Sequence, residues 1–344
     1  MKRRTTWAAM AAATLLLLSA CGNGDSGDDG AAENGAAENG AAENGADEGG
    51  DRPDSLVLGL VPSQDVDKLV EDADVLGDLI GAELGIDVET FISDNYAALV
   101  TAMQTGQADI GMFGPIALVQ AADIAGADVV LQSVRRDSPT YHTQWFTNDP
   151  DTYCLDDVVE VEQEDGSIYT FCNGTDEASE GPIGEDALAL IEQDTPLSMV
   201  DASSASGYFY PATQLENAAG LDPLALDVAF AGGHPNSVLN VARGDFAVGV
   251  SFDDARDNLV EEDPEIGQKV TVFAYSDEIP NDGVALNGEL PEDLRQEIAD
   301  AMVAVMETEE GATAFDEVYS IEGLVPADLE ALDLARQVEQ NFAE

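Results

Sequence analysis

The chain has 344 residues and a formal net charge of −58 at pH 7, with 70 Asp and Glu residues against 12 Lys and Arg. Such an acidic surface repels nucleic acids and anionic membranes, which need basic patches, so direct binding to either is excluded. Hydrophobic residues make up 44% of the chain, enough for a sizeable core in two domains of ordinary size.

Residues 1–21 have the pattern of a lipoprotein signal peptide. The basic residues Lys2 to Arg4 precede an apolar run, Trp7 to Leu18, that is shorter than the ~20 residues needed to span a bilayer. The sequence Leu18-Ser-Ala-Cys21 then matches a bacterial lipobox. We expect an exported chain that acyl groups on Cys21 anchor to the outer face of the cytoplasmic membrane, in a periplasm or at a cell surface. A plain signal peptide with a chance cysteine is the alternative.

Residues 22–53 are predicted to form a disordered acidic tether. They are Gly-, Ala-, Glu- and Asn-rich, and AAENG occurs three times in succession between 31 and 45. No aromatic or branched apolar residue occurs between Cys21 and Leu56, so this segment cannot bury enough surface to fold.

From residue 55 onward, strand and helix patterns alternate. We expect strands at 55–61, 86–92, 108–113 and 128–134, with helices at 65–83, 95–104 and 115–125 between them. This alternation within about 80 residues is typical of a parallel α/β sheet.

Cys154 and Cys172 bracket a predicted hairpin. Two strand patterns, VVEVEQ and IYTF, flank a turn at 164–167. In an exported protein this pair is expected to form a disulfide, which stabilises a loop of this length by roughly 3 kcal/mol. Metal binding by two cysteines is less favoured, and the absence of a C-x-x-C motif argues against a catalytic dithiol.

A second α/β set follows, with strands expected near 197–200, 225–230, 247–252 and 270–275, and closing helices at 291–307, 309–318 and 326–341. We expect the chain to cross between lobes near 147–155 and 276–284. Lobe I would then comprise 54–147 plus 283–344, and lobe II 148–282. Two facing α/β lobes with two crossovers suggest a solute-binding clamp that closes by hinge motion, because ligands sit outside the carboxyl ends of such strands.

Six segments carry a family resemblance: LVLGLVPSQD (56–65), DNYAALVTAMQTGQADIGMFGP (94–115), SPTYHTQWFTN (138–148), SSASGYFYPATQL (203–215), GGHPNSVLNVARGDFAVGVSFDDAR (232–256) and SDEIPNDGVAL (276–286). In this order they resemble the phosphate-, phosphite- and phosphonate-binding proteins of ABC importers over roughly 55–320. The resemblance implies a two-lobe periplasmic-binding-protein (type II) α/β fold with two crossover hinge strands and an inter-lobe ligand cleft. The cysteine hairpin departs from the common pattern, as does Ala205, where many relatives have threonine.

The stretch SSASGYFYP (203–211) is a hydroxyl-rich turn before a helix expected from about 207 to 218. A helix start offers free N–H groups and a positive dipole end, and serine hydroxyls add rotatable donors, so together they suit an oxyanion. An ordinary serine cap is the alternative. The resemblance implies that Ser204, Ala205 and Ser206 meet the ligand.

Four further candidates follow from the same resemblance. Tyr96 opens a helix and would point its phenol across the cleft, although simple packing would also explain it. Tyr141 and His142 lie on the crossover strand, where a structural histidine is the alternative. His234 resembles the family's ligand histidine and would donate to a phosphoryl oxygen.

Asp254 and Asp282 match carboxylate positions of the family site. A carboxylate beside an anion makes sense if it accepts a hydrogen bond from a P–OH group or pairs with the ammonium of an aminoalkylphosphonate. Two carboxylates mildly favour the amine-bearing ligand, while phosphite stays open; helix capping and a turn are the structural alternatives. Because nothing in the sequence places Arg135 or Arg136 in the cleft, we expect neutral donors to hold the anion.

These observations predict a lipid-anchored substrate-binding protein of an ABC importer, monomeric and without cofactor or bound metal, which works with a permease and a separate ATPase. The chain has no Walker A motif of its own. A sensor that presents the same anion and a binder of another oxyanion such as a sulfonate are alternatives. An exported phosphoesterase is less favoured, because the chain has no G-x-S-x-G, H-E-x-x-H or dense His/Asp cluster.

Overall fold

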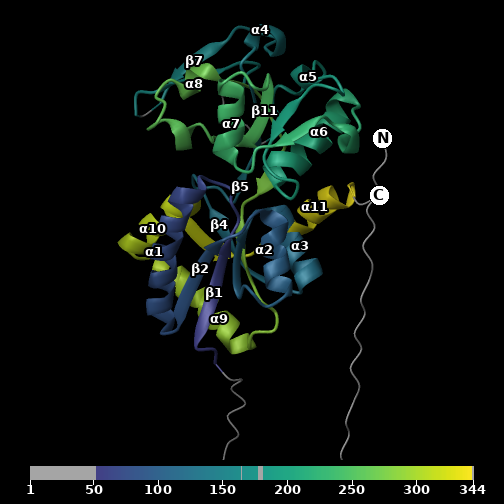
Figure 1. The fold of residues 1–344 in the computed structure, drawn as a ribbon. Helices are drawn as coiled ribbons and strands as arrows, with labels where there is room; N and C mark the ends of the chain where they lie inside the picture. Colours follow the sequence, from purple (N-terminus) through teal and green to yellow (C-terminus); the bar gives the residue numbers. More distant parts are fainter. Residues whose placement is uncertain (1–51, 164, 177–180, 343–344) are drawn as a thin grey trace, which may run out of the picture. The chain divides into compact units, whose positions relative to one another are not determined.

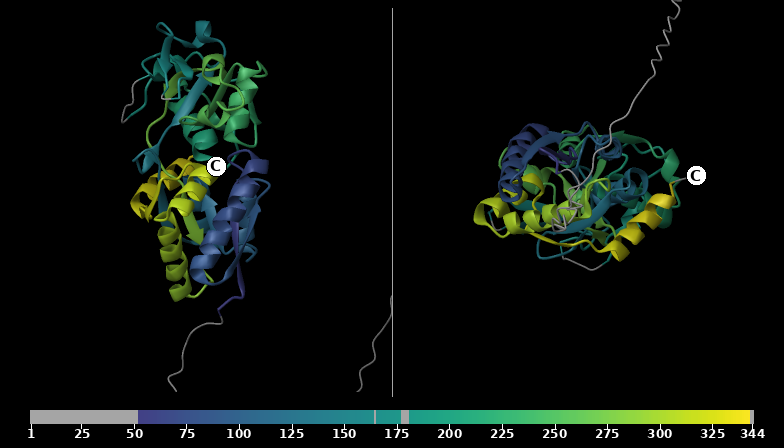
Figure 2. Two further views of the ribbon diagram at one scale, coloured as in Figure 1. Left: turned by 90° about the vertical axis from the view of Figure 1, so that its left-hand side faces the viewer. Right: turned by 90° about the horizontal axis from the view of Figure 1, so that it is seen from below.

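The computed structural model describes residues 52–163, 165–176 and 181–342. The predicted signal peptide, Cys21 and nearly all of the predicted tether lie outside these residues. Within them the chain forms two lobes, each built on its own β-sheet, with a short two-stranded connection between them (Figures 1 and 2). No helix in this described part combines the length and apolar character needed to cross a membrane.

Lobe I is built on a six-stranded sheet in the order β15-β4-β14-β3-β1-β2. Its strands are β1 (Ser55–Leu60), β2 (Asp87–Ile92), β3 (Ile110–Phe113), β4 (Asp128–Val134), β14 (Gly283–Leu286) and β15 (Gly323–Pro326). β1 pairs in parallel with β2 and β3, whereas β14 runs antiparallel between β3 and β4. Every strand and helix predicted between 55 and 134 is present, because continuous apolar runs are typical of strands covered on both faces.

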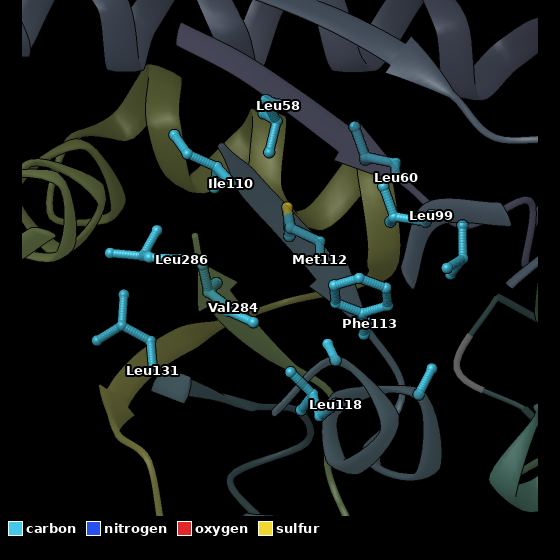
Figure 3. Packing of buried hydrophobic residues seen from close by; sticks show 14 of the residues in the cluster. Leu58, Leu60, Leu99, Ile110, Met112, Phe113, Leu118, Leu131, Val284 and Leu286 are labelled. Carbon is cyan, nitrogen blue, oxygen red and sulfur yellow. The ribbon is translucent and has the colours of Figure 1, made fainter. Parts of the chain in front are cut away.

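Six helices cover this sheet: α1 (Val66–Leu84), α2 (Tyr96–Gln104), α3 (Pro115–Ala125), α9 (Glu292–Met306), α10 (Glu309–Tyr319) and α11 (Leu329–Gln340). α1 packs against α9 and α10, and α3 packs against α2 and α11 (Figure 1). Figure 3 shows the core that results, in which Leu58 and Leu60 of β1 meet Met112 of β3 and Val284 of β14. The core of lobe I thus contains side chains from its N-terminal strands and from β14, which follows the whole of lobe II in the sequence.

Lobe II has a seven-stranded sheet in the order β10-β9-β11-β6-β12-β8-β7. Its strands are β6 (Thr143–Thr147), β7 (Val159–Glu162), β8 (Ile168–Phe171), β9 (Leu197–Met199), β10 (Val228–Phe230), β11 (Val248–Phe252) and β12 (Thr271–Tyr275). Its helices are α4 (Pro150–Tyr153), α5 (Glu185–Leu188), a π-helix (Ala205–Phe209) continued by α6 (Tyr210–Ala219), α7 (His234–Ala242) and α8 (Ile266–Lys269), with 3₁₀ turns at Pro223–Ala225 and Asp257–Leu259. Fully buried side chains such as Trp145 and Phe273 form its core.

The predicted hairpin and disulfide are confirmed. β7 and β8 pair antiparallel, and Cys154, which ends α4, bonds to Cys172 directly after β8 with an S–S distance of 2.10 Å. The disulfide therefore ties the edge hairpin to the chain that leaves β6.

The lobes are joined by β5 (Thr140–Tyr141) and β13 (Ile279–Pro280), which pair antiparallel. β6 already lies inside the second sheet, between β11 and β12, so the first crossover falls at β5 and not near 147–155, where the pattern predicted it. The sequence of β6 reads as a buried strand, but nothing in that pattern tells which sheet receives it.

A second contact joins the lobes near the C-terminus. Phe342, just after α11 of lobe I, packs on Tyr208 and Phe209 of the π-helix, with ring centroids 5.6 and 4.8 Å apart. Lobe I thus touches the helix start that follows the serine-rich turn.

Candidate functional site

A cavity of about 260 Å³ lies between the two lobes, beside the crossover strands. All the candidate ligand residues line it: Tyr96, Tyr141, His142, Ser204, Ala205, Ser206, His234, Asp254 and Asp282. The lining also includes residues that the sequence did not single out, among them Arg135, Arg136 and Tyr319. Residues more than 180 positions apart thereby meet around one space.

The serine-rich turn opens a helix at the cavity. Ser204 is the N-cap, and its Oγ accepts the Gly207 N–H at 3.1 Å, while the hydroxyl proton stays available for another acceptor. The Ser206 hydroxyl is buried and has no hydrogen-bond partner of good geometry among the described residues. Ser204 is therefore an ordinary helix cap, which was the alternative to a ligand contact. The Ser206 hydroxyl, in contrast, can still form hydrogen bonds.

The helix begins at Ala205 as a π-helix, two residues earlier than predicted. Pro211 has no N–H to bond with the Gly207 carbonyl, as an α-helix would require at this position. That carbonyl accepts the Val200 N–H at 3.1 Å instead. The first turn is consequently wide, with the Phe209 N–H bonded to the Ser204 carbonyl at 3.2 Å.

His234 is the first residue of α7 and is held as a neutral imidazole. Its Nδ1 accepts the Phe252 N–H at 3.1 Å and lies 3.0 Å from the Ser251 Oγ. Burial, with a smaller contribution from the Arg135 charge, lowers the pKa of His234 to about 3. Because Nδ1 accepts a backbone N–H, the ring proton lies on Nε2, and the ring can donate from there. The His234 backbone N–H donates to the Ser63 carbonyl of lobe I at 2.9 Å.

The carboxylate of Asp254 is engaged by Arg256, which is fully buried. The Arg256 Nη2 lies 2.6 Å from Oδ2, its Nε lies 3.0 Å from both oxygens, and its backbone N–H donates to Oδ1 at 2.9 Å. Gln144 Nε2 donates to Oδ2 at 2.8 Å. Burial alone would raise the pKa of Asp254, but the Arg256 charge and these hydrogen bonds bring it below its ordinary value.

Asp282 forms an ion pair with Arg135, whose Nη2 lies 2.5 Å from its Oδ2. Arg135 directly follows β4 and Arg136 comes next, pairing with Asp257 at 2.7 Å near the cavity. The expectation that the cleft lacks cationic groups is therefore wrong. Arg135 directly follows the carboxyl end of a predicted strand, where ligands of α/β sheets bind. This position is the signal in the sequence that could have placed Arg135 at the site.

Three tyrosines surround Asp282. Tyr96 follows the N-cap Asn95 of α2, Tyr141 lies on β5, and Tyr319 ends α10. Burial first, and then the Asp282 charge, raises the pKa of each hydroxyl, so all three stay protonated. Tyr319, which donates to the Val61 carbonyl at 2.7 Å, gave no signal in the sequence because it reads as an ordinary core position of an amphipathic helix.

His142 lies on the connection between β5 and β6. Its backbone N–H donates to Asp253 Oδ1 at 2.9 Å, and its Nδ1 lies 3.6 Å from Asp253 Oδ2. Its Nε2 is buried and lacks a partner among the described residues, as do Arg135 Nε, Ser206 Oγ and Gln64 Oε1, all on residues that line the cavity. Unpaired buried polar atoms are costly, so this group of atoms indicates a polar ligand.

Comparison with known proteins relates the chain to a transport family. The profile of the periplasmic substrate-binding proteins of phosphonate ABC transporters matches residues 58–332. The phosphate-import protein PhnD of Mycolicibacterium smegmatis is 25% identical over 284 residues, which cover 79% of this chain and 77% of that protein. The phosphonates-binding periplasmic protein of Escherichia coli is 24% identical over 220 residues, or 63% of this chain and 56% of that protein.

Two solved structures share the fold. A binding protein component of an ABC phosphonate transporter from Pseudomonas aeruginosa aligns with a TM-score of 0.66 and 18% identity, over 84% of this chain and 86% of that one. PhnD1 from Prochlorococcus marinus in complex with methylphosphonate aligns with a TM-score of 0.68 and 16% identity, over 85% of this chain and 99% of that one. The predicted two-lobe periplasmic-binding-protein fold is confirmed.

Proposed function

Because this chain belongs to the family of periplasmic substrate-binding proteins of phosphonate ABC transporters, we propose that it binds a small phosphorus oxyanion between its lobes and delivers it to a membrane permease. Members of this family bind substrates and do not transform them, so the chain is a binding protein and not an enzyme. The permease and a separate ATPase are the partners that this role requires.

The observation that carries the proposal is the set of unpaired buried polar atoms around one cavity. Arg135 Nε comes from lobe I, Ser206 Oγ from lobe II, and His142 Nε2 from the connection between them. An anion that accepts hydrogen bonds from all three would be held only while the lobes are together. Such an anion binds the closed form more tightly than the open form, and it would therefore shift the hinge equilibrium toward the closed form.

Two helix starts add their dipoles to these side chains. The π-helix that begins at Ala205 and α7, which begins at His234, both open at the cavity. The N–H groups of Gly207 and His234 are already bonded to the Ser204 Oγ and the Ser63 carbonyl, so what both helix starts contribute is the positive end of a dipole, which favours negative charge. Local dipoles and hydrogen-bond donors at the cavity act on the ligand independently of the net charge, which is negative over the chain as a whole. This explains how an acidic protein can hold an anion.

The Arg135 guanidinium adds a cationic donor to these neutral ones, and variants at Ser206 and Arg135 measure how much each kind contributes to the binding free energy. Both kinds of donor line the same cavity.

The proposal extends to where the protein works. The pattern of residues 1–21 supports export, and the lipobox supports acylation of Cys21 with retention at the outer face of the cytoplasmic membrane. The segment 22–53 would then act as a flexible tether between the anchor and the binding lobes. Expression of a Cys21→Ala variant tests the anchor: it should move from the membrane fraction to the soluble extracytoplasmic fraction, and continued membrane retention would contradict acylation.

Calorimetry tests the binding function directly. Purified protein lacking residues 1–21 is titrated with phosphate, phosphite, methylphosphonate and methanesulfonate in high salt, which screens the acidic surface. We expect saturable binding of at least one phosphorus anion. A Ser206→Ala variant should weaken it about tenfold, in line with one lost hydrogen bond, while Ser167→Ala in the β7–β8 turn serves as a matched control without effect. Tighter binding of methanesulfonate than of every phosphorus anion, or no binding at all, would overturn the proposal.

A further inference from the structure

We infer that Arg135, held in place by Asp282, is a specificity-determining ligand contact, and that this ion pair makes the cleft select phosphorus oxyanions that carry no amine. The inference rests on the proposed function and narrows its ligand class. It replaces the sequence-based preference for an amine-bearing ligand, which depended on two free carboxylates.

The first argument is the geometry of Arg135. The pair with Asp282 uses Nη2, at 2.5 Å from Oδ2, whereas the buried Nε has no partner among the described residues. Both side chains are largely buried, with 17% and 19% of their surfaces exposed. A guanidinium is a rigid fork of donors, so fixing one of its ends directs the others. The unused Nε–H and the neighbouring cavity suit an anionic oxygen.

The second argument concerns Asp282. An ammonium group on a ligand would have to share this carboxylate with a guanidinium, which already contacts its Oδ2. The ligand's ammonium would also lie beside the Arg135 charge, and two like charges in a partly buried site repel each other. An ammonium that displaced Arg135 from Oδ2 would leave a largely buried guanidinium uncompensated.

The third argument concerns Asp254, the other carboxylate expected to meet an amine. Arg256 donates to both of its oxygens at 2.6–3.0 Å, and Gln144 donates to Oδ2 at 2.8 Å. The Arg256 guanidinium itself lies over the rings of Tyr169 and Phe171, with its Cζ 4.3 and 4.7 Å from their centroids. Both oxygens of this carboxylate are committed to a packed internal cluster, which makes it a poor partner for a ligand amine.

The other acidic side chains of the lining are also engaged. Asp257 pairs with Arg136 at 2.7 Å, and Asp253 accepts the His142 backbone N–H at 2.9 Å. The Arg136 guanidinium also donates to the Asp253 backbone carbonyl at 3.1 Å, so a positive charge lies beside this part of the acidic lining. Two exposed glutamates complete the acidic lining, and each already accepts a hydrogen bond: Glu278 and Glu322.

The test compares two ligands that differ by the amine. Dissociation constants for methylphosphonate and 2-aminoethylphosphonate are measured by calorimetry on the wild-type protein, on Arg135→Gln and on Arg295→Gln. The last is a matched control, because Arg295 forms a partly buried 2.5 Å pair with Asp128 outside the cavity. Wild type should prefer methylphosphonate by about tenfold or more, as expected for a charge-assisted contact that the amine opposes.

Arg135→Gln should weaken methylphosphonate at least about tenfold, and it should move the preference toward 2-aminoethylphosphonate because Asp282 becomes free. Arg295→Gln should change neither constant. If Arg135→Gln fails to fold, the double variant Arg135→Gln/Asp282→Asn removes both charges; it should lose methylphosphonate affinity without gaining any for the amine.

Three outcomes would overturn the inference. One is equal or tighter binding of 2-aminoethylphosphonate by the wild type, which leaves the proposed function intact. Another is an unchanged ligand preference in Arg135→Gln, which would show that the ion pair has no part in selection. The third is the absence of binding to both ligands and to phosphate, which would remove the proposed function together with the inference.

Discussion

Replacement of His234 by asparagine tests whether the cleft holds a neutral histidine. In the structure Nδ1 accepts the Phe252 N–H at 3.1 Å, and the asparagine Oδ1 can take over this acceptor role. Burial lowers the pKa of His234 from 6.5 to about 3. Between these pH values the unfolded chain therefore binds a proton at this histidine and the folded protein does not. The variant removes this difference while keeping a polar side chain at the start of α7.

The sign and size of the effect follow from proton linkage. Below pH 6.5 the unfolded chain binds one more proton than the folded protein, so the wild-type free energy of unfolding falls as the pH decreases from 6.5 toward about 3. Each pH unit in that window costs about 1.4 kcal/mol for one proton. Between pH 7 and pH 5 the histidine should therefore destabilise the wild type by about 2 kcal/mol relative to the variant.

Urea unfolding at pH 8, 7, 6 and 5, without ligand and at constant high salt, measures this difference. The two proteins should keep a constant difference in free energy between pH 8 and 7, where histidine is neutral in both states. From pH 7 to 5 the difference should shift by about 2 kcal/mol in favour of the variant. The carboxylates titrate equally in both proteins and cancel. Parallel curves over the whole range would show that the imidazole is not held neutral, and the reasoning about its donor role would fail.

Three further predictions concern stability and binding. Ser204→Ala removes a helix cap and should lower the free energy of unfolding by about 1 kcal/mol. Ser206→Ala removes a hydroxyl that has no hydrogen-bond partner of good geometry among the described residues, and it should change this free energy by less than about 0.5 kcal/mol. Equal losses in urea unfolding would contradict this distinction. Asp254→Asn leaves a buried guanidinium uncompensated and should cost about 3–5 kcal/mol, while Asp263→Asn, in a more exposed pair with Lys269, should cost less than about 1 kcal/mol; similar midpoints for the two would refute the buried cluster. Reducing the disulfide should lower the free energy of unfolding by roughly 3 kcal/mol, and an unchanged urea midpoint after verified reduction would speak against its stabilising role.

Local patterns were enough to predict most of the secondary structure. The apolar runs at 55–61 and 108–113 and the alternation around the cysteine hairpin each point to one kind of element, because burial on both faces and burial on one face leave different traces in a sequence. The sequence of β6 shows the limit of this reasoning. Its residues are all buried, but the choice between two sheets depends on strands more than 100 positions away.

The sequence predicted which residues form the candidate site better than it predicted how their charges are paired. Resemblance placed all nine residues at one cavity, but the partners of the carboxylates were not visible. Arg135 and Asp282 are 147 positions apart, so no spacing rule connects them. Asp254 and Arg256 are close in sequence, but the groups that hold the guanidinium in the interior, the rings of Tyr169 and Phe171 and the Thr170 and Val270 carbonyls, come from other parts of the chain. Charge pairing depends on tertiary contacts, which a linear pattern does not specify.

The contact of Phe342 with Tyr208 and Phe209 has a practical consequence for anyone who wishes to report ligand capture with a fluorescent label. A bulky fusion attached directly after the C-terminal helix would press on the turn that carries Ser206, and would perturb the very event it was meant to record. The chain enters β1 at the opposite end of lobe I, away from the cavity (Figure 1). Dyes or purification handles are better placed on that side.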